Sequence, residues 1–187
     1  MQNSKRAIFR KGEKVSLGPV VKEDLETLVI HINDEETSRF LTVNYPISYE
    51  MEKDWFDRIN KSTNEEIHLA IIENSSNDLV GVTGLHKINH INRTSGFGIA
   101  LRKKFHQKGY GTEAATLIIR YAFNYLNLRK VCSSAFALNE KSLKLHFKLG
   151  FTKEGVKKEQ FFKQGIYTDE VILGLFRNDF FKVVNGS

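Results

Sequence analysis

The most informative segment of this chain is FHQKGYGTEAA, at residues 105–115. An apolar segment, residues 97–101, precedes it. The segment that follows carries apolar side chains at helical spacing, at Ala114, Ile118, Tyr121, Ala122 and Tyr125. Glycines at positions 109 and 111 let the backbone approach a ligand closely, and the first amides of a helix have no partners within it. The pattern predicts a strand, a glycine turn and a helix whose N-terminus binds a pyrophosphate.

Three alternatives compete with this interpretation of the turn. A Walker A loop is excluded because no Gly-Lys-Ser/Thr follows a glycine at the required distance. A dinucleotide fingerprint fits better, since Gly109, Gly111 and Ala114 satisfy G-x-G-x-x-A. The next predicted strand, however, carries no acid to hold a ribose and ends at Asn139. A plain glycine turn that joins a strand to a helix stays open for so short a motif.

The rest of the chain reads as strands and helices around this unit. Because a helical crossover joins the strands on either side of the turn, these two strands should run parallel. Asn139 is expected to cap a short helix, and Gly150 to end it in a left-handed conformation. We predict strands at 15–21, 67–73, 79–88, 95–101, 131–138, 152–162 and 166–176, and helices at 22–32, 48–59, 112–126 and 140–149.

Length and composition indicate one globular domain over residues 1–187. The chain is 41% hydrophobic with 14 phenylalanines, and a domain of this size buries roughly 70% of the surface of its unfolded chain. Residues 1–14 are expected to form a charged, flexible lead-in. No apolar run reaches the length of a membrane span, and the amino terminus lacks the apolar stretch of a signal peptide. We therefore expect a cytoplasmic protein.

The net charge of +6 suggests a polyanionic partner. Its densest run, residues 102–108, coincides with the glycine turn, so a phosphate-bearing cofactor explains it best. Nucleic acid is not expected, because the sequence contains neither zinc-finger spacing nor an RNA-binding aromatic motif. The single cysteine, Cys132, provides no disulfide and no cysteine metal cluster, and no metal is expected. Cys132 is predicted to be a small buried residue and not a nucleophile.

Two segments resemble the GCN5-related N-acetyltransferase (GNAT) family. The run from His106 to Thr112 resembles its Q/R-x-x-G-x-G/A acetyl-CoA loop, with histidine at the first position. Asn139-Glu-Lys-Ser142, followed by Leu149-Gly-Phe151, resembles its second block. The resemblance covers about residues 15–180. It implies a GNAT-like α/β fold, in which a mixed, mostly antiparallel sheet contains a splayed pair of parallel strands and carries helices on both faces.

The resemblance also implies an activity. Within the family, YAFNYLNLRKV (121–131) and FFKQGIYTDEVILGL (161–175) are most similar to the spermidine acetyltransferases and to the acetyltransferases of ribosomal-protein amino termini. It implies direct transfer of the acetyl group of acetyl-CoA to a primary amine, either a polyamine or the amino terminus of a protein. An aminosugar is a third acceptor. A non-catalytic acyl-CoA sensor and, more weakly, a nucleotide-binding dehydrogenase are the rival functions.

The residues that the resemblance assigns to acetyl-CoA surround the loop and the two parallel strands. In the family, the main chain of residues 99–101 would hold the donor and supply an amide for the tetrahedral oxyanion, while Asn139 reaches the pantetheine arm. His106 replaces the Gln or Arg with which the family loop begins and would hold the pyrophosphate more weakly. Arg102 or Lys104 would compensate for the weaker binding. The assigned residues are Ile99, Ala100, Leu101, His106, Gln107, Lys108, Gly109, Tyr110, Gly111, Thr112, Asn139 and Ser142.

Proton transfer is where the sequence departs from the family. A lysine-like amine titrates near ~10.4, so a base must take its proton. The family often uses a glutamate on the strand before the loop, and its position here is Gly96. Glu113, His86 and His90 are alternatives, each also explained as an ordinary helix-start, strand or turn residue. The base is therefore unassigned.

His146 is the catalytic candidate. It stands where the family usually places a tyrosine that protonates the departing thiolate, and imidazole can donate a proton near neutral pH. An ordinary helix histidine explains it equally well, because a thiolate with a pKa of about 8.5 also leaves unaided.

Acidic runs at 34–36 and 50–57 lie where the family forms its acceptor pocket, although helix-start acids explain the same letters. The acceptor and a homo-oligomeric state are left open by the sequence.

Overall fold

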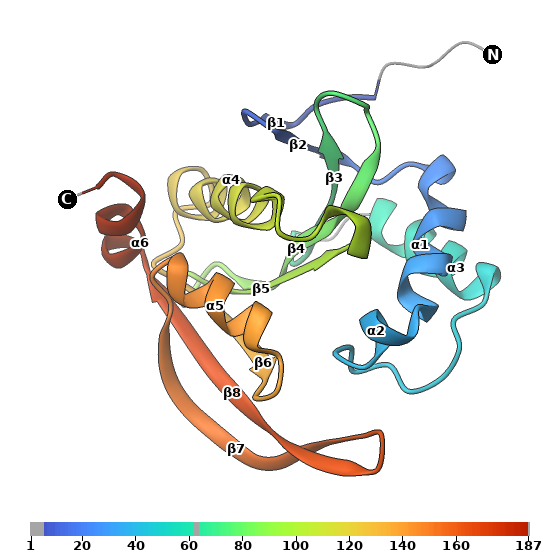
Figure 1. Cartoon of the computed structure of the whole chain (residues 1–187). Helices are drawn as coiled ribbons and strands as arrows, with labels where there is room; N and C mark the ends of the chain where they lie inside the picture. Colours follow the sequence, from blue (N-terminus) through green and yellow to red (C-terminus); the bar gives the residue numbers. More distant parts are fainter. Residues whose placement is uncertain (1–5, 62–63, 187) are drawn as a thin grey trace.

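The computed structural model describes residues 6–61 and 64–186. In these residues one eight-stranded sheet has the order β1-β2-β3-β4-β5-β6-β8-β7 (Figure 1). Its strands are β1 (Arg10–Lys11), β2 (Val15–Pro19), β3 (Ile67–Glu73), β4 (Leu79–Asn89), β5 (Thr94–Leu101), β6 (Lys130–Phe136), β7 (Thr152–Lys163) and β8 (Ile166–Phe176). Every neighbouring pair is antiparallel except β5 and β6, which confirms the predicted mixed sheet.

Six α-helices and two short 3-10 helices accompany the sheet in the described residues. The α-helices are α1 (Leu25–Asn33), α2 (Glu35–Ser38), α3 (Tyr49–Asn60), α4 (Tyr110–Asn124), α5 (Glu140–Lys148) and α6 (Arg177–Val184), and the 3-10 helices are η1 (Lys22–Asp24) and η2 (Lys103–Phe105). Within residues 6–61 and 64–186, no helix is both long and apolar enough to cross a bilayer.

Alternation along β3 divides the core between the two faces of the sheet. Leu69 and Ile71 belong to the cluster that contains the buried side of α4, where Ile118 and Ala122 are fully enclosed. Ala70 and Ile72 belong to a second cluster with residues of α1 and α3. Because successive strand residues point to opposite faces, these two clusters lie on opposite sides of the sheet. The predicted helices on both faces are therefore confirmed.

The parallel strands β5 and β6 stay paired over a short distance only. Their register runs from Thr94 opposite Lys130 to Gly96 opposite Cys132. Beyond this point β6 continues to pair with β8, while β5 keeps only β4 as a partner. The Ser133 hydroxyl bridges the start of the gap by donating to the Phe97 carbonyl oxygen at 3.1 Å. The predicted splay is thus present, and it leaves one edge of β5 open.

Local signals set the helix ends near this gap. The Asn139 side chain accepts from the Ser142 amide at 3.1 Å and caps α5, as predicted. Gly150 has φ +93° at the end of that helix, also as predicted. Helix α4 begins at Tyr110, two residues earlier than expected, because Gly109 takes φ +84° as its N-cap. The glycine thus sits at the sharp bend that aims the helix N-terminus.

The amino-terminal segment differs from the expected lead-in. Residues 10 and 11 form β1, and the Arg6 guanidinium pairs with the carboxylate of Asp24, which is 3% exposed. These contacts fix residues 6–14 against β2 and η1, whereas residues 1–5 lie outside the described part of the chain. The assignment of residues 1–187 to one domain stays a prediction.

Candidate active site

The glycine turn presents a row of free backbone donors. Within the described residues, no protein acceptor meets the amides of residues 107–112, and the first helical bond runs from the Glu113 amide to the Gly109 carbonyl at 3.1 Å. Gln107 joins Gly109 in the left-handed region, with φ +62°. Six consecutive unpaired amides at the positive end of α4 form a site suited to a phosphate group.

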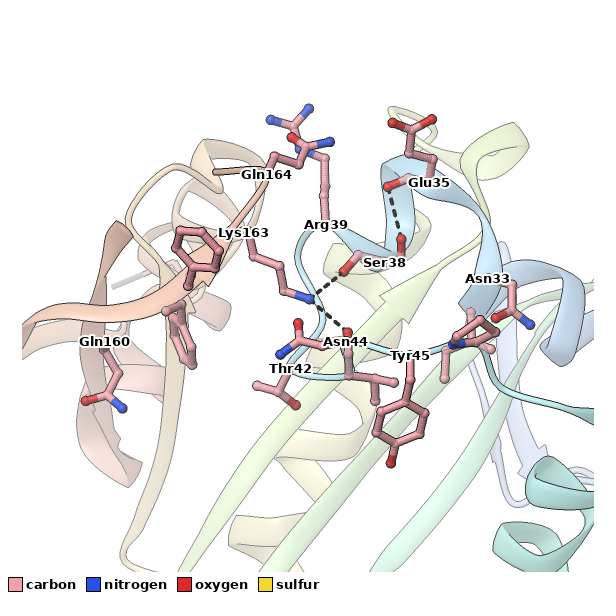
Figure 2. A pocket seen from close by; sticks show the side chains of 15 residues that line it. Asn33, Glu35, Ser38, Arg39, Thr42, Asn44, Tyr45, Gln160, Lys163 and Gln164 are labelled. Atoms are coloured by element: carbon pink, nitrogen blue, oxygen red, sulfur yellow. Dashed lines mark hydrogen bonds between the residues drawn. The ribbon is translucent and has the colours of Figure 1, made fainter. Parts of the chain in front are cut away.

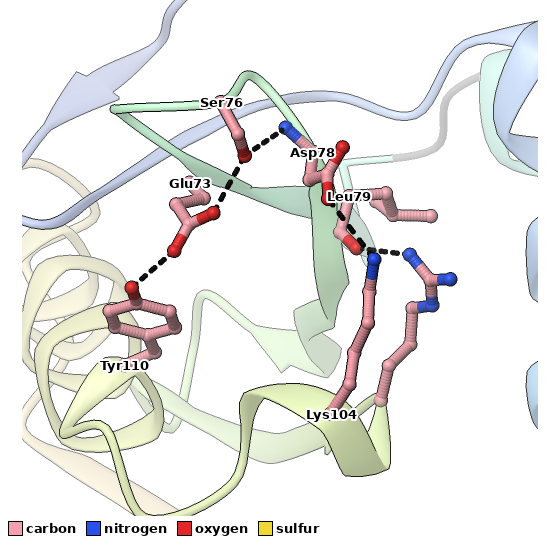
Figure 3. A network of polar contacts seen from close by, with 7 residues as sticks. Glu73, Ser76, Asp78, Leu79, Lys104 and Tyr110 are labelled. Atoms are coloured by element: carbon pink, nitrogen blue, oxygen red, sulfur yellow. Dashed lines mark hydrogen bonds and ion pairs between the residues drawn. The ribbon is translucent and has the colours of Figure 1, made fainter.

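Side chains of the turn anchor it to the β3–β4 hairpin (Figure 3). The Glu73 carboxylate accepts hydrogen bonds from the hydroxyls of Ser76 and Tyr110. Both bonds lower the pKa of Glu73, and the bond from Ser76 has the larger effect. The Lys104 ammonium pairs with Asp78 at 3.1 Å, and the Arg102 guanidinium donates to the Leu79 carbonyl at 2.7 Å. Arg102 and Lys104 therefore hold the loop in place. These contacts compete with the predicted role of the two side chains, which was to bind the pyrophosphate in place of the usual first loop residue.

His106 fastens the turn to the strand before it. Its Nε2 donates to the Leu101 carbonyl at 2.9 Å, so the loop closes on the last residue of β5. An additional cation approaches the turn from β1–β2: the Lys14 Nζ lies 3.9 Å from where a Cβ on Gly109 would be. The Lys14 amide itself donates to the Glu113 carboxylate at 3.0 Å. Glu113 thus contacts the segment before β2 and does not line the cleft between β5 and β6.

A cleft of about 400 Å³ lies at the gap between β5 and β6. The predicted residues that it brings together are Ile99, Ala100, Asn139, Ser142 and His146. The Phe97 carbonyl faces Ser133, and the Arg102 amide pairs with the Val80 carbonyl on β4. Since main-chain groups alternate along a strand, those of Ile99 face the open edge and those of Ala100 face β4. The cleft is therefore bordered by a free strand edge.

His146 lies in the wall of the cleft, behind Ser133. Its Nδ1 donates to the Ser142 carbonyl at 2.7 Å, and its Nε2 lies 2.8 Å from the Ser133 Oγ. The side chain is 3% exposed. Burial lowers the pKa of His146, against a raising effect of the Ser142 carbonyl, so the imidazole is neutral at pH 7. With Nδ1 carrying the proton, Nε2 can only accept, so the single proton of the Ser133 hydroxyl is shared between two acceptors, Nε2 and the Phe97 carbonyl oxygen.

The two histidine candidates for the base differ in position. His86, on β4, lines the cleft and pairs across the sheet with Gly96 of β5. His90, in the turn after β4, is exposed, and its Nε2 lies 3.3 Å from the Asn64 carbonyl oxygen. His68 and Glu170 also line the cleft, although no motif in the sequence marks either of them. Only the strand register, which places distant residues on one face, could have found them.

A second cavity, the α2 pocket, adjoins the cleft. It has a volume of about 730 Å³ and lies between α2 and the tip of the β7–β8 hairpin (Figure 2). Thr42 and Phe161 line both cavities, so the two are contiguous. The Lys163 ammonium crosses this pocket to donate to the carbonyls of Ser38 at 3.3 Å and Val43 at 2.8 Å. The pocket thus joins segments more than a hundred residues apart.

Three of the seven acidic residues suggested for an acceptor are already engaged. Asp34 caps α2 by accepting from the Thr37 amide, Glu36 pairs with Lys103 at 2.7 Å, and Asp57 pairs with Lys53 at 2.8 Å. Glu35 is the member of these runs that lines the α2 pocket. Cys132 is half-buried, and burial raises the pKa of its thiol, consistent with a structural residue.

The family model of the acetyltransferase (GNAT) domain matches residues 14–152. The chain belongs to this family. The predicted family, fold and acyltransferase class are therefore confirmed, and the predicted cosubstrate, acetyl-CoA, is that of the family. The loop and the strand gap described above both lie within the matched residues.

Individual GNAT relatives agree with this assignment. The chain is 28% identical to spermidine N(1)-acetyltransferase of Escherichia coli (strain K12) over 166 residues, which cover 89% of this chain and 88% of the relative. It is 33% identical to the putative ribosomal N-acetyltransferase YdaF of Bacillus subtilis (strain 168) over 101 residues, 54% of this chain and 55% of YdaF.

A solved structure shares the fold. The crystal structure of spermidine N-acetyltransferase from Vibrio cholerae in complex with CoA and spermine superposes with a TM-score of 0.83, covering 90% of this chain and 99% of that chain at 22% identity. At this identity the likeness extends to the fold of the GNAT enzyme and not to its acceptor.

Proposed function

We propose that this acetyltransferase moves the acetyl group of acetyl-CoA directly to a primary amine bound in the cleft. The observation that carries the proposal is the open edge of β5, which runs from the free amides of the loop to the cleft. A ligand lying along this edge can use strand-like hydrogen bonds, while the loop amides bind its diphosphate. Its thioester end then lies beside the cleft.

The loop and the strand edge divide the binding of acetyl-CoA between them. The amides of residues 107–112 bind the pyrophosphate, and Lys108 and Lys14 add positive charge. The main chain of Ile99 faces the pantetheine arm and supplies a donor to the oxyanion. The Asn139 side-chain oxygen caps α5, so its amide nitrogen is the group directed at the arm.

His146 is proposed to act through Ser133 on the departing thiolate. Because the imidazole lies behind the serine, with 2.8 Å between Nε2 and Oγ, a proton passes between His146 and the cleft by way of the hydroxyl. The neutral imidazole takes up at Nε2, through the Ser133 hydroxyl, a proton that the acceptor nitrogen loses as the C–N bond forms. The hydroxyl then transfers a proton to sulfur as the imidazolium returns its own to Oγ.

The acceptor is proposed to be a polyamine or the amino terminus of a protein such as a ribosomal protein. Relatives with both printed activities are similar to this chain. The α2 pocket favours the protein terminus, because Arg39 and Lys163 line it against one carboxylate, that of Glu35 (Figure 2). Two cations repel a polyamine, whereas they attract the carbonyls and acidic side chains of a peptide.

A panel of amines tests the proposal. Release of the CoA thiol is measured with spermidine, an aminosugar, and peptides that begin with the amino termini of ribosomal proteins. Turnover with a peptide or with spermidine supports the function and identifies the acceptor class. Thermal stabilisation by acetyl-CoA without turnover on any amine would refute it and would indicate an acyl-CoA sensor.

A further inference from the structure

We infer that His86 is the general base of acetyl transfer, its imidazole filling the space that Gly96 leaves above the neighbouring strand. The inference rests on the proposed function. It assigns a catalytic role to a residue of β4, whereas the loop and the strand gap are built from β5, β6 and α4.

The geometry of the β4–β5 pair carries the assignment. His86 lies opposite Gly96, and a Cβ built on Gly96 would stand 2.1 Å from the His86 Nε2 and 2.4 Å from its Cδ2. Real Cβ atoms do not approach so closely, so the ring occupies the place of a side chain on β5. Gly98, the next residue on that face of β5, meets no atom within 4 Å. The two glycines thus leave this face of β5 free of side chains, with the His86 imidazole beside the free surface.

The other titratable groups that line the cleft are committed elsewhere. The Glu170 carboxylate pairs with Lys157 at 2.9 Å. Burial raises the pKa of Glu170, but hydrogen bonds from Ser134 and Lys157 outweigh it and lower that pKa, which makes the carboxylate a weak base. The His146 Nε2 faces Ser133, and the His68 Nε2 lies 3.1 Å from Glu66. Among the described residues, no hydrogen bond to His86 contributes to its pKa, which burial and nearby charges alone determine.

The surroundings of His86 keep its imidazole neutral and allow it to gain and lose a proton reversibly. Burial lowers the pKa of His86, Lys87 and His68 lower it further, and Glu66 raises it. A base must be unprotonated to act, and His86 meets this condition at pH 7. Glu66, which contacts His68, has a carboxylate that is 35% exposed to solvent. Its negative charge stabilises the imidazolium that forms on His86.

With His86 as the base, acetyl transfer conserves protons and electron pairs. The ammonium of the acceptor gives one proton to His86, which becomes an imidazolium, and the free amine forms the C–N bond with the thioester carbonyl carbon. The C–S bond then breaks, and its electron pair goes to sulfur. The second proton of the nitrogen passes to the sulfur by way of Ser133 and His146, and the His86 imidazolium releases its proton to water. The products are the amide, the CoA thiol and one proton, which matches the overall reaction.

The first test compares His86→Gln with His90→Gln in steady-state kinetics, using the amine that the parent enzyme acetylates. We expect His86→Gln to lower kcat by about 10²–10⁴-fold with the KM for acetyl-CoA unchanged, while His90→Gln retains the parent kcat. The parent kcat should level off above the His86 pKa. In His86→Gln it should keep rising toward the pKa of the amine itself, about 10.4 for a lysine-like amine and about 7.7–8.0 for the amino terminus of a peptide.

A second variant guards against a misfolded substitution. His86→Ala combined with Gly96→Glu places a carboxylate in the same space from the other strand, and circular dichroism confirms the fold. We expect it to recover roughly tenfold or more of the kcat lost in His86→Ala. Two results would overturn the inference: a parent-like kcat and pH profile in His86→Gln, or a folded double variant no more active than His86→Ala. A parent without turnover on any amine overturns the proposed function instead.

Discussion

Replacing His31 with leucine should make the protein markedly more resistant to acid. His31 of α1 is 8% exposed, and in the described residues its Nε2 has no hydrogen-bond partner. Burial lowers the pKa of His31 from 6.5 to about 4, and the nearby charge of Arg102 contributes. Since the unfolded chain keeps a pKa near 6.5, it binds more protons than the folded chain between these values. Stability is therefore complete above pH 6.5 and falls as the pH falls toward 4.

The size of the effect follows from the two pKa values. At 1.36 kcal/mol per pKa unit, a change from 6.5 to about 4 corresponds to about 3 kcal/mol when the titration is complete. At pH 4.5 about 2.5 kcal/mol of this is already lost. His31→Leu cannot take up the proton and should lack this part of the loss.

Urea unfolding followed by Trp55 fluorescence provides the assay. The free energy of unfolding is measured for the parent, His31→Leu and the exposed control His90→Leu at pH 7.5 and pH 4.5. The parent and the control should lose about 2.5 kcal/mol more than His31→Leu between the two pH values. Equal losses in the parent and His31→Leu would contradict this prediction, because they would show that His31 titrates normally in the folded state.

Three further substitutions test the loop and the cleft. Gly109→Ala, at φ +84°, should cost about 1–2 kcal/mol of stability and weaken acetyl-CoA binding in calorimetry, whereas Gly165→Ala, at φ +80° in the β7–β8 turn, should cost a similar amount and leave that affinity unchanged. Ser133→Ala should lower kcat and abolish any effect of His146→Phe on the pH profile, and independent effects would contradict the relay. Asn139→Ala should lose about 1 kcal/mol of unfolding free energy and also raise the Kd for acetyl-CoA, so a stability loss alone would assign it to capping only.

Local sequence patterns predicted the parts of the site that depend on neighbouring residues. The turn at 105–115, the caps at Asn139 and Gly150, and the hairpin of β7 and β8 all have short-range chemical causes. Helix α6 was missed because it follows β8 directly, with no glycine or proline to mark the boundary.

Contacts across strands could not be predicted in the same way. The position of His86 beside Gly96 depends on the register of β4 and β5, and that of Ser133 before His146 on the packing of α5 against β6. A single sequence specifies such pairings only through the completed sheet. The base was therefore unassigned from the sequence, although His86 and Gly96 had each been considered in relation to it.

The open edge of β5 has a consequence for how this enzyme tolerates change. Its ligand contacts are proposed to come from the peptide groups of Ile99, which every residue except proline supplies equally. The side chains of Ile99 and Leu101 pack against the core beneath α4. Aliphatic replacements at these two positions should change the packing of the core and leave the binding of the coenzyme unchanged. Ile99→Pro, by contrast, should remove the backbone N–H donor, which no other substitution at this position removes.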